Sequence, residues 1–186
     1  MKTTIRFCMM GLFAIAFLAN CGTQLNEQEK KMVGVWNCTG YEEEDETDEN
    51  YRRTLTYDNS FEYKADRTLT QRTICNERVY VNEEDYDNII TFEWEITGSG
   101  TWSIEGNQII EKLNECDINL KKIRTAVKND DDQEYVLRLK ATLEDEIPDW
   151  RNSYLKKEEN KVIYITDSKF LGEDEEGDEI ELIRVK

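Results

Sequence analysis

The chain has 186 residues, with 41 Asp and Glu against 24 Lys and Arg, a formal net charge of −17, no histidine and one proline. Without histidine, the sequence excludes Ser-His-Asp and Cys-His catalytic centres and imidazole-ligated metal sites. So acidic a chain repels phosphate backbones, which argues against nucleic-acid binding, and no run reaches the ~20 apolar residues of a membrane-spanning helix.

The first twenty residues predict a secretory signal peptide. Lys2 and Arg6 form a basic start, and the uncharged run over residues 7–19 has the length and character of the apolar core of such a signal. Removal of residues 1–20 takes away two positive charges and no negative ones, so the mature chain is more acidic still.

The run ends in Leu18-Ala19-Asn20-Cys21-Gly22, which resembles the lipobox of bacterial lipoproteins. In that family the cysteine receives a diacylglyceryl group, and two acyl chains hold a protein on a membrane where one would not. The resemblance implies a lipid anchor on Cys21, a tether over residues 21–30 and one domain over residues 31–186. The alternative is an ordinary cleaved signal with an accidental cysteine.

Along the domain, a short helix over residues 26–32 is predicted ahead of the first strand. Beyond it the pattern has mostly a period of two, which is typical of half-buried antiparallel strands. Apolar and polar residues alternate in this way over residues 61–65, 90–96 and 135–141.

Turn-forming residues separate such segments, and tight turns between many short strands favour a sandwich or an up-and-down barrel. One segment differs: residues 148–159 predict a short surface helix, with Pro148 in its first turn and two lysines near its end. The predicted turns lie at residues 58–60, 65–67, 97–100, 105–107 and 176–178.

A set of segments in this order is similar to the lipocalin-like lipoproteins of Bacteroidota. Gly34-Val35-Trp36, a Gly-x-Trp after a helical turn, looks like the opening of lipocalins. The resemblance covers the chain from residue 31 onward, and it implies an all-β, antiparallel, up-and-down lipocalin-like barrel with one short surface helix. The remaining segments that carry it are residues 61–68, 100–107, 163–167 and 180–184.

In lipocalins the Trp of Gly-x-Trp lies at the closed end of the barrel, and an Arg from the last strand stacks across it. The resemblance gives these places to Trp36 and Arg184. Arg184 shares alternation parity with Ile180 and Leu182, so it points inward if they do. A guanidinium over an indole face contributes about 0.5–2 kcal/mol. We therefore expect this pair to close the barrel rather than to bind a ligand.

Inward aromatic side chains are the candidate ligand-lining residues, because an eight-stranded barrel can hold one small apolar molecule such as a lipid. The alternative is that they fill the barrel as core, which is favoured because small barrels are often packed solid. These candidates are Tyr63, Phe92, Trp94, Trp102 and Tyr135.

No catalytic, cofactor or metal site is predicted. The acidic runs at residues 42–49, 130–132 and 173–179 lack the spacing of a calcium loop and are interpreted as solvated loops. Carboxylate pairs are too frequent in so acidic a chain to select a hydrolase site.

Three cysteines remain in the domain after the signal and the anchor. Cys38, Cys75 and Cys116 allow either one disulfide with a free thiol or three thiols, and their spacing matches no metal motif.

The sequence thus predicts a non-enzymatic protein of the bacterial cell envelope, anchored to the outer membrane through Cys21, that binds or carries a small hydrophobic molecule. The alternative is a filled barrel that serves as an interaction module for an envelope protein or glycan. Some surface-exported lipoproteins of Bacteroidota carry acidic residues directly after the cysteine, whereas Glu27 and Glu29 come later. This favours the periplasmic face over the cell surface.

Overall fold

The computed structural model describes residues 24–46, 51–81, 89–125 and 130–186. The predicted signal peptide and Cys21 lie outside these residues. Within them the elements follow one another as α2 (Glu27–Met32), β1 (Gly34–Glu46), β2 (Tyr51–Tyr63), β3 (Thr68–Val81), β4 (Ile89–Glu105), β5 (Gln108–Thr125), α3 (Asp130–Tyr154), β6 (Lys157–Ile165), β7 (Lys169–Glu173) and β8 (Glu179–Arg184).

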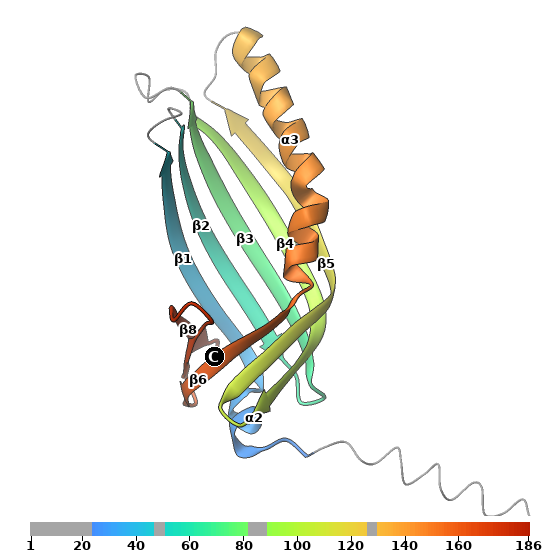
Figure 1. Cartoon of the computed structure of the whole chain (residues 1–186), viewed down its shortest axis with the longest axis vertical. Helices are drawn as coiled ribbons and strands as arrows, with labels where there is room; N and C mark the ends of the chain where they lie inside the picture. Colours follow the sequence, from blue (N-terminus) through green and yellow to red (C-terminus); the bar gives the residue numbers. More distant parts are fainter. Residues whose placement is uncertain (1–23, 47–50, 82–88, 126–129) are drawn as a thin grey trace, which may run out of the picture.

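Each strand pairs antiparallel with the next, and β8 returns to β1, which closes a barrel. The predicted all-β, up-and-down, lipocalin-like barrel is confirmed. Among the described residues, β8 meets β1 only at Trp36 and Asn37, and β5 meets β6 over residues 108–112. The barrel is therefore closed at the end that holds α2, while β1 to β5 continue beyond it as a long curved sheet (Figure 1).

Helix α3 covers part of the inner face of that sheet. Residues three or four apart on one side of the helix, Val136, Leu139, Leu143 and Ile147, pack against the apolar inner side chains of β3 to β5. The strand predicted over residues 135–141 is therefore wrong. Its alternation is short, whereas the helical period extends through the whole element, and Leu137, which the alternation would bury, is 67% exposed.

The helix predicted over residues 148–159 is also wrong in its bounds. Helix α3 already contains Pro148 in its interior and ends at Tyr154, and the chain enters β6 at Lys157. The short helix predicted at residues 26–32 is confirmed as α2. Asn26 caps it, because its side chain accepts a hydrogen bond from the Glu29 N–H at 2.8 Å.

Three predicted turns, at residues 65–67, 105–107 and 176–178, join consecutive strands, but those at 58–60 and 97–100 lie inside β2 and β4. The glycines of β4 serve a different purpose. Pairing with β5 shifts register between Ser99 and Gly100, and a side chain at Gly100 would collide with the Lys112 carbonyl. The turn-like composition marks a bulge within a continuous strand.

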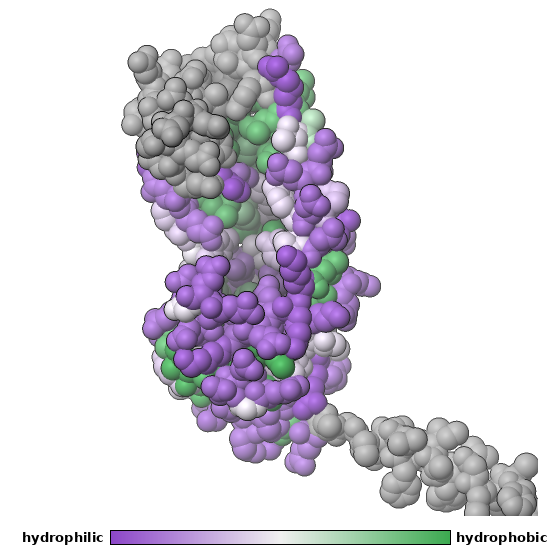
Figure 2. All heavy atoms as spheres, viewed as in Figure 1, coloured by the Kyte–Doolittle hydropathy of each residue, from purple (hydrophilic) through white to green (hydrophobic). Residues whose placement is uncertain are grey.

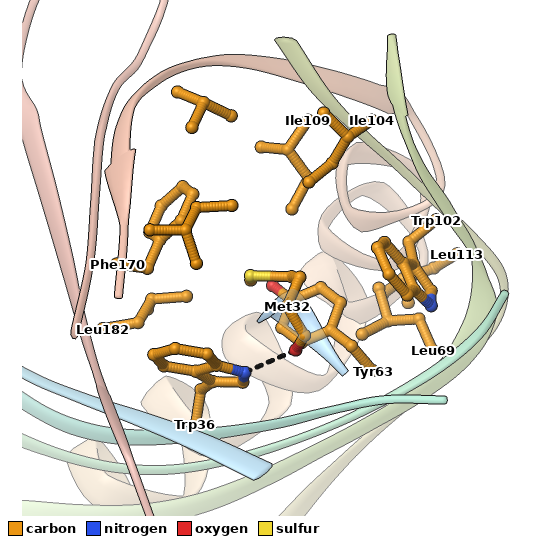
Figure 3. Packing of buried hydrophobic residues seen from close by; sticks show 12 residues of the cluster. Met32, Trp36, Tyr63, Leu69, Trp102, Ile104, Ile109, Leu113, Phe170 and Leu182 are labelled. Carbon is orange, nitrogen blue, oxygen red and sulfur yellow. Dashed lines mark hydrogen bonds between the residues drawn. The ribbon is translucent and has the colours of Figure 1, made fainter. Parts of the chain in front are cut away.

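The closed end is filled by side chains from α2 and from the surrounding strands (Figure 3). Met32 and Trp36 are fully buried, and the Trp36 indole donates to the Met32 carbonyl at 2.7 Å. The rings of Tyr63 and Trp102 meet edge to face with centroids 5.4 Å apart. This end of the barrel is a packed core.

Candidate ligand cavity

The interior is hollow between the closed end and α3. A cavity of about 600 Å³, open to solvent on one side, is lined by residues of β1 to β4, β8 and the end of α3. A second cavity of about 270 Å³ lies between β2 to β5 and α3, and both are lined by Leu55, Cys75, Ile96 and Tyr154. Figure 2 shows hydrophobic residues in the recess beside α3 within a mostly hydrophilic surface. The larger volume lies within the range of about 300–1,000 Å³ that is common for small-molecule sites.

The wall of the larger cavity follows from the two-residue period of β2. Leu55, Tyr57, Asn59 and Phe61 share parity, and all four line the cavity. Opposite Tyr57 on β1 lies Gly40, and a side chain there would collide with the Tyr57 phenol. Glycine thus lets the Tyr57 ring lie across β1.

A polar row crosses the same wall. Asn59 pairs in register with Cys38 on one side and with Thr73 on the other. Thr73 is buried, and its hydroxyl accepts a hydrogen bond from Gln71 Nε2 at 3.3 Å. The cavity therefore combines apolar surface with hydrogen-bonding groups.

Of the four candidate aromatic residues whose side chains the structure describes, one reaches these cavities. Trp94 lines the smaller one, where its ring meets Trp150 of α3 edge to face. Tyr63 and Trp102 belong to the closed-end core and Phe92 to the core under α3, and none of the three lines either cavity. Tyr135 lies in α3 rather than in the strand predicted for it, and its side chain is outside the described part of the molecule.

Sequence reasoning missed Leu55, Tyr57 and Tyr154 as lining residues. The alternation recognised at Phe61 and Tyr63 continues backward through all of β2, which would have identified the first two. The turn predicted at residues 58–60 divides this strand in the sequence, so the full alternation of β2 is not recognised there. Tyr154 had no comparable signal, because its position depends on where α3 meets the sheet.

A buried ion pair borders the smaller cavity. The Glu77 side chain is 3% exposed, and its carboxylate forms an ion pair with Arg53, whose Nε lies 2.7 Å away, and accepts a hydrogen bond from the Trp94 indole N–H at 3.0 Å. These contacts offset the cost of burying the charge. The charge of Glu77 is thus already compensated by protein groups.

A niche of about 20 Å³ adjoins the larger cavity, because Phe61, Gln71 and Tyr154 line both. It is also bordered by Glu111, Glu158 and other residues. The two glutamates lie directly opposite each other across β5 and β6, where like charges are destabilising.

The surroundings make Glu111 difficult to ionise. Burial raises its pKa to about 7, the Glu158 carboxylate acts in the same direction, and the hydrogen bond from the Tyr63 hydroxyl, 2.5 Å from Glu111 Oε1, opposes the rise. Desolvation by neighbouring protein atoms also raises the pKa of Glu158, although this residue keeps an exposed surface. A carboxyl with a raised pKa beside a cavity is a candidate functional group.

The pair expected at the barrel end is present as a contact. Arg184 Cζ lies 4.2 Å from the centroid of the Trp36 ring, and Arg184 Nη1 donates to the Val33 carbonyl at 2.5 Å. Gly34 has a φ of 143°, and a side chain there would collide with the Arg184 guanidinium. The first residue of Gly-x-Trp thus provides the space in which Arg184 reaches Trp36.

Cys38, Cys75 and Cys116 are free thiols, and burial raises the pKa of Cys75 to about 11. Within the described ranges, no three Cys, Asp or Glu residues gather as a metal ion would require. No described helix has the length and apolarity to cross a membrane. Comparison with known proteins finds no matching family model and no matching curated protein.

Proposed function

We propose that this protein is a lipid-anchored, lipocalin-like protein of the bacterial envelope that binds or carries a small hydrophobic molecule. The observation that carries this proposal is the cavity of about 600 Å³ beside α3, with Leu55, Tyr57, Phe61 and Ile96 in its lining. Apolar walls with a few polar groups are typical of sites that bury most of a small ligand. The filled-barrel alternative fits the closed end but not this cavity.

Filling the cavity tests the proposal. Leu55 lines both cavities, so Leu55→Trp is expected to weaken binding of N-phenyl-1-naphthylamine, an uncharged apolar fluorophore, at least tenfold. A fluorescence titration measures this. Leu137→Trp is the matched control, because Leu137 is exposed on α3 and the same change there leaves binding intact. Saturable binding that is equal in both variants would place the fluorophore elsewhere and contradict the proposal.

The anchor is tested separately in cells. Cys21→Ser is expected to abolish incorporation of radiolabelled palmitate and to release the protein from the membrane fraction, because the acylated thiol is lost. Cys38→Ser, which changes a thiol inside the domain, should leave both properties unchanged. Palmitate incorporation that persists in Cys21→Ser would exclude Cys21 as the acylated residue.

A further inference from the structure

We propose that the ligand carries a cationic amine, which binds between Glu111 and Glu158 while the apolar body of the ligand occupies the larger cavity. This inference rests on the proposed function and adds the chemical class of the ligand. It is carried by the acidic side chains that line the cavity and the niche, by the facing carboxylates of Glu111 and Glu158, for which the described residues provide no ion pair, and by a buried acceptor without a partner in the wall of the larger cavity.

The charged residues that line the larger cavity are all acidic. They are Glu42, Glu179 and Glu181, and the set of lining residues includes neither Lys nor Arg. Cationic side chains lie around this cavity: Arg53 lines the smaller cavity and pairs with Glu77, Lys169 pairs with Glu181 at 2.7 Å, and Lys156 borders the niche. A fatty acid or another anionic amphiphile would meet no Lys or Arg side chain in the lining of the larger cavity itself.

The niche supplies a place for the cation. Its volume of about 20 Å³ exceeds the roughly 10–15 Å³ that holds one water, so an ammonium-sized group fits. An ammonium has three N–H donors and can donate hydrogen bonds to both facing carboxylates at once. Lys156 also borders the niche, but within the described residues no ion pair joins it to Glu111 or Glu158. A bound amine would therefore relieve a repulsion that the protein itself leaves in place.

A further acceptor lies on the wall of the larger cavity. Asn59 Oδ1 is buried and has no hydrogen-bond partner among the described residues. Leaving a buried acceptor unpaired is unfavourable, so a ligand donor that reached it would be stabilising. Asn59 lies one row beyond Phe61, which borders the niche.

The test compares three probes with the same twelve-carbon chain and different head groups. Dodecylamine, dodecanol and dodecanoate are used below their micellar concentrations at pH 7.5, and each displaces bound N-phenyl-1-naphthylamine. We expect dodecylammonium to bind at least tenfold more tightly than dodecanol, and dodecanoate more weakly than dodecanol. Because the chains match, differences among the three report the head group alone.

Matched charge changes separate the niche from the overall acidity of the protein. Glu111→Gln and Glu158→Gln are expected to reduce the preference for the amine to less than threefold. Glu146→Gln removes the same charge from an exposed position on α3, and this variant should keep the preference for the amine. Thermal denaturation confirms that each variant is folded before its affinities are compared.

Two results would overturn the inference of a cationic ligand, and a third would overturn the proposed function on which it rests. Dodecanol binding as tightly as the amine would reject the cationic ligand and leave the proposed function intact. An equal fall in the amine preference in Glu111→Gln and Glu146→Gln would show that the preference comes from the overall acidity of the protein. That result would also reject the niche as the binding site for the amine. Failure of all three probes to displace the fluorophore, with Leu55→Trp indistinguishable from Leu137→Trp, would reject the proposed function itself.

Discussion

Replacing Trp36 by alanine is expected to lower the free energy of unfolding by about 3–5 kcal/mol, as is usual when a large buried aromatic side chain is truncated. Trp36 is fully buried at the point where β1 meets β8. The substitution leaves a void in the closed-end core, removes the donor to the Met32 carbonyl and takes away the ring beneath Arg184. Urea denaturation followed by far-ultraviolet circular dichroism measures the loss.

Trp150 provides the control for this substitution. It is half-buried on α3 and meets Trp94 across the smaller cavity, so Trp150→Ala opens an existing hollow instead of a packed core. We expect a loss of stability clearly smaller than that of Trp36→Ala. An unchanged melting temperature for Trp36→Ala would mean that the closed end does not depend on this residue.

Two kinds of signal predicted the closed end. The resemblance to lipocalins assigns Trp36 and Arg184 to it, and the parity of a single short strand adds only that Arg184 points the same way as Ile180 and Leu182. The capped helix α2 is encoded by adjacent residues, with Asn26 and Glu29 three apart. Only this helix requires nothing more than regular backbone geometry among neighbours in sequence.

Helix α3 could not be predicted in the same way because two periods compete within it. Residues 135–141 alternate over a short stretch, but Leu139, Leu143 and Ile147 recur at helical spacing and find apolar partners on the inner face of the sheet. Which period prevails depends on tertiary contacts, since a helix is stabilised mainly by burying its apolar face. The extent of the cavities, in turn, depends on where α3 ends.

The niche could not be predicted from the sequence for a related reason. Parity could identify an inward residue but could not distinguish core from cavity lining, as the contrast between Phe92 and Trp94 shows. Glu111 and Glu158 are separated by the whole of α3 and become neighbours only through the register of β5 with β6. In a chain with 41 acidic residues, no local pattern marks that pair.

Replacing Glu111 by glutamine is expected to stabilise the ligand-free protein above pH 7 and to have little effect near pH 5. The pKa of Glu111 rises from 4.5 to about 7 on folding, so between these values the folded state holds more protons than the unfolded state. Stability is therefore present at low pH and is lost as the pH rises toward 7. Glutamine stays neutral throughout and can still accept the hydrogen bond from Tyr63.

The upper limit of the gain at pH 8 is about 3–4 kcal/mol, since the rise from 4.5 to about 7 spans about 2.5 pKa units and each unit corresponds to about 1.4 kcal/mol. Melting temperatures of wild type and Glu111→Gln at pH 5 and pH 8 measure it, with Glu146→Gln as the exposed control. A gain of equal size at both pH values would show that charge in the niche is not the cause. A gain confined to high pH, together with loss of the amine preference, would mean that the carboxylate pair lowers stability in exchange for recognising a cation.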